Sequence, residues 1–226
     1  MLKRIVHNRG VDGTEAEADV DTGELVRLNA AVVRASVAVV GKVGDGDLGG
    51  PTPCAEWTVA DLVAHMTIQH EGFAAAAAGE GADLARWRCE RVPEAAEALV
   101  VEYAVAADRV IEAFAVDGTG DRRFDLPEIS TAVTFRASQA IGFHLVDYVA
   151  HGWDVARSLG LGYDLEPAIL EAALAIARAV PDGAPRLRPG AAFAPRVTQA
   201  TTAEARQLDR ILALLGRDPG WMPVLR

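Results

Sequence analysis

The stretch from Phe143 to Gly160, FHLVDYVAHGWDVARSLG, places four ionisable side chains on a helix that is otherwise apolar. At about 100° per residue, these four side chains share one arc of roughly 80°. They are His144, Asp147, His151 and Asp154. Apolar residues cover most of the remaining circumference, which predicts a helix that is buried nearly all round. Burying imidazolium and carboxylate groups without a partner costs several kcal/mol, so the four groups need a shared partner.

Two partners would satisfy this arc. One is a mutual network of histidines and aspartates, and the other is a divalent cation, which binds neutral imidazole and ionised carboxylate together. Asp147 and His151 stand at positions i and i+4, so both point into the same space of a bundle. His65, in the apolar run LVAHM, is the natural third ligand. Three ligands of mixed nitrogen and oxygen type leave positions open for water or substrate, which is typical of a catalytic metal site. We expect zinc there, and nickel, iron or manganese also suit these ligands.

His144 and Asp154 flank this pair by three residues on either side. They could hold the tautomers of the ligand histidines or contact a substrate, and we expect both to move protons during catalysis. Asp154 has an alternative partner in Arg157 at i+3.

Two further residues, one within the run that contains His65 and one before it, carry weaker signals. His70 stands about 140° round the helix from His65, which predicts a side chain that faces solvent. Cys54 precedes a helix start, where a thiol can have a lowered pKa and act as a nucleophile. We favour a packing role for Cys54 beside Trp57.

The elements that position these residues are mainly helices. Apolar spacing, capping signals and Gly/Pro breaks predict helices over residues 24–43, 59–78, 94–115, 133–159, 166–180 and 203–215. Thr58 and Asp61 form a capping box before the second helix, and Gly160 is a candidate left-handed cap of the fourth. The loop DGTGDRRFDLPEIS contains a short extended piece. The fold class is therefore all-α, and short connections favour antiparallel neighbours in a bundle.

We divide the chain into a flexible arm over residues 1–20, a metal-binding four-helix bundle over residues 21–160, and a C-terminal helical extension over residues 161–226. The net charge is −10, the pI is near 5.0, and no Lys/Arg cluster is dense, so nucleic acid and membrane surfaces are not expected partners. No apolar run is long enough to span a bilayer. We expect a cytoplasmic protein with reduced cysteines, and a homodimer formed through its alanine-rich helix faces.

Three stretches resemble a known superfamily: PTPCAEWTVADLVAHM, LVDYVAHGWDVARSLG and LDRILALLGRDPGW. Together they are similar to the DinB-like, mycothiol-dependent maleylpyruvate isomerase superfamily, and above all to its small metal-binding members. The resemblance runs from about residue 24 to the C-terminus. It implies a four-helix bundle with up-down-down-up connectivity and a divalent ion held by His65, Asp147 and His151. The isomerase has glutamate where this chain has Asp147, so the ligand arm here is one methylene shorter.

The resemblance also implies an activity. We expect an enzyme in which a metal brings a low-molecular-weight thiol, mycothiol, to a small electrophilic substrate for transfer or isomerisation. Two alternatives remain open. One is a thiol-independent hydrolase, lyase or cyclase of specialised metabolism, and the other is a metal-binding protein without turnover.

Overall fold

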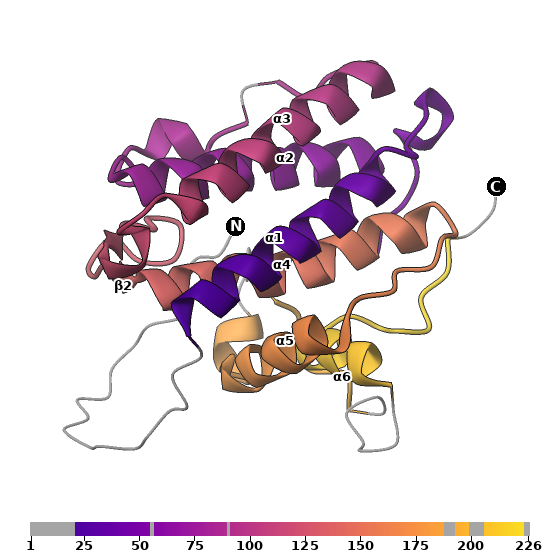
Figure 1. Ribbon diagram of the computed structural model, residues 1–226. Coiled ribbons are helices and arrows are strands. Elements are labelled where there is room, and N and C mark those ends of the chain that lie inside the picture. Colours follow the sequence, from indigo (N-terminus) through magenta and orange to yellow (C-terminus); the bar gives the residue numbers. More distant parts are fainter. Residues whose placement is uncertain (1–20, 55–56, 90, 188–192, 199–205, 224–226) are drawn as a thin grey trace.

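The computed structural model describes residues 21–54, 57–89, 91–187, 193–198 and 206–223 (Figure 1). Four long helices form its main body: α1 (Thr22–Val40), α2 (Val59–Ala78), α3 (Ala96–Ala115) and α4 (Ala137–Ser158). Two shorter helices follow, α5 (Pro167–Ala179) and α6 (Gln207–Leu214). The described strands are β1 (Arg123–Phe124) and β2 (Phe135–Arg136), which pair antiparallel. The predicted all-α class is confirmed.

The four long helices pack as two pairs, α1 against α4 and α2 against α3, and the pairs contact each other. α1 and α4 run in one direction, while α2 and α3 run in the other (Figure 1). A hydrogen bond from the backbone N–H of Ala96 to Asp45 Oδ1, at 2.8 Å, ties the start of α3 to the 3₁₀ turn Asp45–Asp47 that follows α1. The connectivity is thus up-down-down-up, as the resemblance implied. The expectation of antiparallel consecutive neighbours is wrong for α2 and α3, which pack against each other and run in the same direction (Figure 1).

Local sequence signals set the helix ends. α2 begins after the predicted capping box, in which Thr58 Oγ1 accepts from the N–H of Asp61 and the Asp61 carboxylate accepts from the N–H of Thr58. α4 begins at Ala137 rather than at residue 133, because Phe135 and Arg136 pair with β1 instead of joining the helix. Gly160 follows α4 with a φ of 69°, which confirms the left-handed turn.

α4 lies in the middle of the molecule and is buried on nearly every side, as its composition predicted. α2 is also more enclosed than predicted, since α3, α4 and the 3₁₀ turn Leu84–Trp87 all contact it. The expectation that His70 faces solvent is therefore wrong. Its side chain is fully buried and stacks on Tyr148, with the ring centroids 4.0 Å apart.

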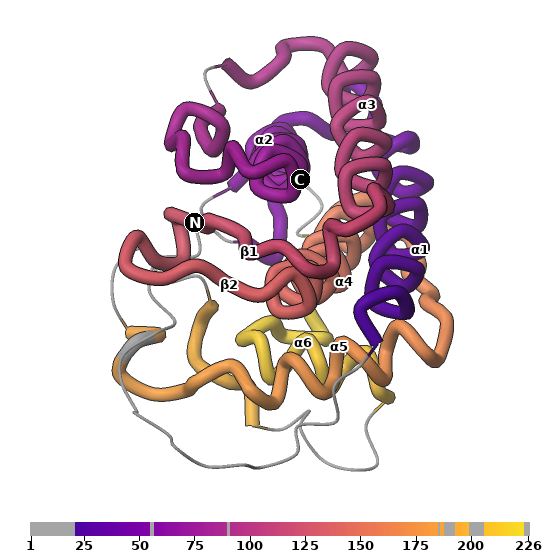
Figure 2. Tube along the Cα trace, turned by 60° about the vertical axis from the view of Figure 1, so that its left-hand side comes forward, coloured from indigo at the N-terminus to yellow at the C-terminus, as the bar shows by residue number. Residues whose placement is uncertain are grey.

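The C-terminal part packs on the side of the bundle that α1 and α4 form (Figure 2). α5 contacts both of these helices, and α6 contacts α5. After α6 the chain turns at Gly216, which has a φ of 79°, and a Cβ there would meet the carbonyl oxygen of Ala194 at 2.3 Å. This turn directs Arg217 toward α4. The predicted arm over residues 1–20 and the first residues of the predicted last helix, 203–205, lie outside the described residues.

Among the described helices, none combines the length and the apolar character that crossing a bilayer requires.

Candidate metal centre

The structure brings the three predicted metal ligands together. One ligand atom from each of His65 on α2 and Asp147 and His151 on α4 lies within 4.8 Å of the other two. His151 Nε2 is 3.5 Å from Asp147 Oδ1. The two imidazole rings meet nearly edge to face, with centroids 5.4 Å apart, and the Trp57 ring covers His65 at 4.5 Å. Two nitrogen donors and a carboxylate thus converge from two helices.

The carboxylate of Asp147 shows that this cluster fits a cation. The side chain is only 6% exposed, and its Oδ2 is buried without a hydrogen-bond partner among the described residues. Buried carboxylate oxygens are normally hydrogen-bonded or bound to a metal, because an unpaired one loses its hydration without compensation. A divalent ion between Asp147 and the two imidazoles would satisfy this oxygen.

The other nitrogen of His151 is held by a second carboxylate. His151 Nδ1 lies 3.0 Å from Asp154 Oδ2, and Asp154 is fully buried. An Nδ1–H that donates to Asp154 leaves the lone pair of His151 on Nε2, the nitrogen that faces Asp147. This arrangement of carboxylate and imidazole is the usual support for a metal-binding histidine.

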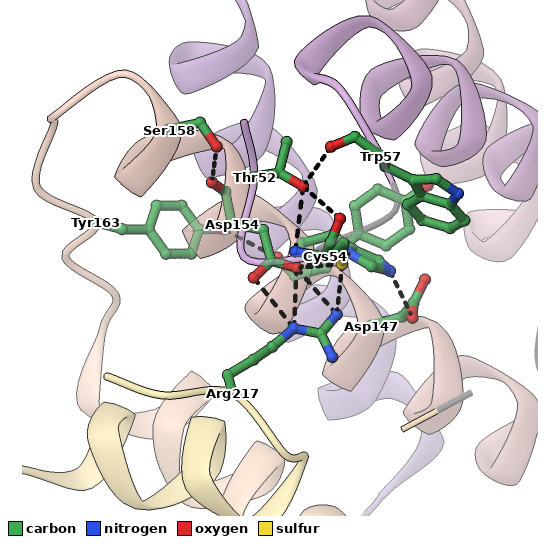
Figure 3. A network of polar contacts seen from close by, with 10 residues as sticks. Thr52, Cys54, Trp57, Asp147, Asp154, Ser158, Tyr163 and Arg217 are labelled. Carbon is green, nitrogen blue, oxygen red and sulfur yellow. Dashed lines mark hydrogen bonds and ion pairs between the residues drawn. The ribbon is translucent and has the colours of Figure 1, made fainter. Parts of the chain in front are cut away.

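Arg217 holds Asp154 in place from the C-terminal segment (Figure 3). Its Nη2 donates to Asp154 Oδ2 at 3.0 Å and lies 3.0 Å from Cys54 Sγ, while its Nε is 3.2 Å from both carboxylate oxygens. Cys54 Sγ in turn donates to Asp154 Oδ2 at 3.3 Å. The alternative pairing of Asp154 with Arg157 does not occur, since Arg157 donates to the carbonyl oxygen of Trp221.

Cys54, His151 and Asp154 form a second group that is close enough to hold an ion. In this group the guanidinium of Arg217 already provides positive charge, within hydrogen-bond distance of both Cys54 and Asp154. In the described part of the chain, the group of His65, Asp147 and His151 has no arginine or lysine within hydrogen-bond distance, and it contains the unpaired oxygen of Asp147. The donor set of His65, Asp147 and His151 is therefore the better fit for a metal.

Burial and charge set the protonation of these side chains. Burial lowers the pKa of His65 well below its usual value, so its imidazole is neutral and can donate a lone pair. Burial also favours neutral His151, but the charge of Asp147 and the hydrogen bond with Asp154 outweigh it and raise its pKa to about 10. Burial alone would raise the pKa of Asp154, yet the charge of Arg217 and the bond with His151 lower it to about 2. The space between the carboxylates thus favours positive charge.

His144, predicted to act beside the ligands, lies in a different place. Its Nδ1 accepts from Asn29 Nδ2 at 2.9 Å, and its Nε2 is 3.1 Å from His70 Nδ1, deep in the bundle. Burial lowers the pKa of His144 to about 3. One turn of α4 separates it from the cluster, and there α1 and α2 present Asn29 and His70 instead of His65.

Sequence reasoning missed Arg217 and underrated Cys54. Arg217 lies in LDRILALLGRDPGW, which pointed only to a resemblance, and no local spacing links it to Asp154, 63 residues earlier. Cys54 follows Thr52, whose Oγ1 donates to the carbonyl oxygens of Cys54 and Trp57 and so shapes the loop before α2.

Comparison with known proteins identifies the family of this chain. Residues 30–156 match the model of the mycothiol maleylpyruvate isomerase N-terminal domain. The chain belongs to this family. The match covers α2 and almost all of α4, and with them every residue of the proposed ligand set.

Relatives of the chain include an uncharacterized protein of Mycobacterium tuberculosis, found in two strains. It is 32% identical over 188 residues, which span 81% of this chain and 92% of the relative. Among solved structures, the mycothiol-dependent maleylpyruvate isomerase superposes with a TM-score of 0.55 at 14% identity, over 75% of this chain and 77% of that one. A histidine-to-alanine mutant of that isomerase gives 0.54 at 14% identity, over 73% and 72%. These two structures share the fold of this family member.

Proposed function

We propose that this protein is a metal-dependent enzyme that adds mycothiol to a small electrophile, ending in thiol transfer or in isomerisation of a double bond. His65, Asp147 and His151 would hold one divalent ion, with zinc as the first choice. The observation that carries the proposal is the buried carboxylate of Asp147, which lies beside the imidazoles of His65 and His151 and whose Oδ2 has no hydrogen-bond partner among the described residues. Membership of the mycothiol maleylpyruvate isomerase family supports the choice of thiol.

When bound, the ion would lower the pKa of a thiol and polarise a substrate carbonyl. The chain's own residues prepare its site. Asp154 keeps the Nε2 lone pair of His151 directed at the site, and Arg217 and Cys54 fix Asp154. We therefore assign Asp154 a positioning role rather than the proton transfer that its sequence position suggested, because its low pKa keeps it ionised.

The addition and elimination of the thiol require no oxidant and no second co-substrate. The thiolate forms a carbon–sulfur bond with one carbon of an activated cis double bond, and the electron pair moves onto the conjugated carbonyl oxygen. Rotation about the new single bond and expulsion of the thiolate give the trans product and regenerate the thiolate. If the adduct instead takes up the proton that the thiol lost, the product is a thioether and one thiol is consumed.

Metal content in tag-free protein tests the ligand set. We expect about one divalent ion per chain in the wild type and a large loss in His65→Gln and His151→Gln. The matched variant is Cys54→Ser, which should keep its metal because Cys54 belongs only to the second group. Metal that is retained by His65→Gln but lost by Cys54→Ser would indicate the group of Cys54, His151 and Asp154. That result would contradict the proposed ligand set.

Turnover tests the thiol. The metal-loaded protein should convert a small conjugated carbonyl compound only when mycothiol is added. Equal turnover with and without mycothiol would favour a thiol-independent hydrolase, lyase or cyclase instead.

A further inference from the structure

A small cavity borders the candidate metal centre on the side of Asp147. Its volume is about 80 Å³. It is lined by Phe143, Val146 and Asp147 of α4, by Ile176, Ala179 and Val180 at the end of α5, and by Phe193. The cavity therefore lies where the C-terminal part covers the bundle, between the site and the outside.

The cavity has a buried inner wall and an open mouth. Val146, Asp147 and Phe193 are all less than 8% exposed, whereas Ala179 is exposed to solvent. Asp147 forms part of the buried wall of the cavity, and its Oδ2 has no hydrogen-bond partner among the described residues. A molecule that enters past Ala179 would thus reach Asp147, one of the proposed ligands, along apolar walls.

Among the described residues, the lining carries one carboxylate and no cationic side chain. Two described arginines near Phe193 in sequence, Arg186 and Arg196, donate to backbone carbonyl oxygens, and the Arg186 guanidinium also lies over the Phe193 ring, 5.8 Å from its centroid. Arg186 Nη1 bonds to the carbonyl oxygens of Ala194 and Leu214, and Arg196 Nη2 bonds to that of Val180. An anionic group in the apolar part of this cavity, away from the proposed ion, would lose its hydration and meet no cationic side chain among the described lining residues.

We propose that the substrate places an uncharged hydrocarbon group in this cavity, so that the enzyme acts on small neutral electrophiles with a short apolar chain. This inference rests on the proposed function and narrows its substrate class. At roughly 10–15 Å³ for each water-sized occupant, the cavity has room for about six non-hydrogen atoms. Maleylpyruvate carries a carboxylate at each end, and neither end matches these walls.

A matched pair of enones tests the substrate class. Hex-3-en-2-one ends in an ethyl group, and 4-oxopent-2-enoate ends in a carboxylate at the equivalent carbon. With metal-loaded enzyme and mycothiol, we expect kcat/KM to be at least about tenfold higher for the uncharged enone, after division by the rate of the uncatalysed thiol reaction. Equal values, or a preference for the carboxylate, would overturn the inference and leave the proposed function intact.

Two variants of α5 locate the effect. Ala179→Leu adds bulk at the mouth and should lower kcat/KM for hex-3-en-2-one about tenfold. Ala175→Leu is the matched control, because Ala175 is exposed one turn earlier on the same helix and does not line the cavity. An equal loss in both variants would contradict the assignment of the cavity.

Xenon gives a readout that needs no turnover, since xenon binds apolar cavities. Crystals of the metal-loaded protein under xenon pressure should show an atom among Val146, Ile176 and Phe193, which Ala179→Leu reduces and Ala175→Leu retains. A cavity without xenon in the wild type would overturn the inference. Failure of mycothiol to promote turnover of either enone, with xenon bound as expected, would instead overturn the proposed thiol chemistry.

Discussion

Replacing Asp154 tests how the metal centre is supported. Asp154 is fully buried and accepts hydrogen bonds from Arg217, which is only 7% exposed. In Asp154→Asn the guanidinium stays buried without its counter-charge, and breaking one side of a buried ion pair costs about 3–5 kcal/mol. The amide would also no longer fix the tautomer of His151, and the loss of such a support lowers metal affinity by about 10–100-fold.

Urea denaturation of metal-free protein at pH 7 measures the first effect, and zinc competition with a chromophoric chelator measures the second. The matched control is Asp209→Asn. Asp209 makes a similar two-pronged contact with Arg206, at 3.0 and 3.3 Å, but the Arg206 side chain is 86% exposed. An exposed pair contributes less than about 1 kcal/mol, so this control should unfold almost as the wild type does.

A double variant completes the cycle. Asp154→Asn combined with Arg217→Met removes both charges, so it should be less destabilised than the sum of the two single variants, by about 1–3 kcal/mol. The reasoning is refuted if Asp154→Asn costs no more than Asp209→Asn, or if it leaves zinc affinity unchanged. The first result would mean that the buried pair contributes nothing, and the second that His151 needs no support.

Three further predictions concern the pH dependence of stability, two glycines with positive φ, and the effect of zinc on the melting temperature. Burial holds the pKa of His144 at about 3 and that of His70 well below 6.5, so the unfolded chain binds more protons below pH 6.5. The free energy of unfolding should therefore decrease as the pH is lowered from 7 to 5, by about 2 kcal/mol from His144 alone, with His70 adding in the same direction. Equal values in urea melts at both pH values would contradict this. Gly216→Ala should lower the melting temperature more than Gly160→Ala, because both have positive φ but only the first Cβ meets backbone. Zinc should raise the melting temperature of EDTA-treated wild type but not of His65→Gln, and an equal rise in both would exclude His65 as a ligand.

The sequence was sufficient for features that depend on neighbours along the chain. The capping box of Thr58 and Asp61 set the start of α2, and the apolar circumference of residues 143–160 set the burial of α4. The i, i+4 spacing of Asp147 and His151 also required no tertiary knowledge, because helical geometry alone points both side chains the same way. These signals work because capping and helical periodicity are decided within one or two turns.

Only the tertiary structure decided which partner each side chain meets. His144 and Asp147 share an arc of α4, yet they have different neighbours. His144 contacts Asn29 and His70, while Asp147 lies beside His65 of α2. Arg217 reaches Asp154 only because the chain turns after α6 and returns to α4. Helical spacing gives the direction of a side chain about its own axis. The order and direction of the packed helices, which depend on contacts distant in sequence, determine what lies in that direction.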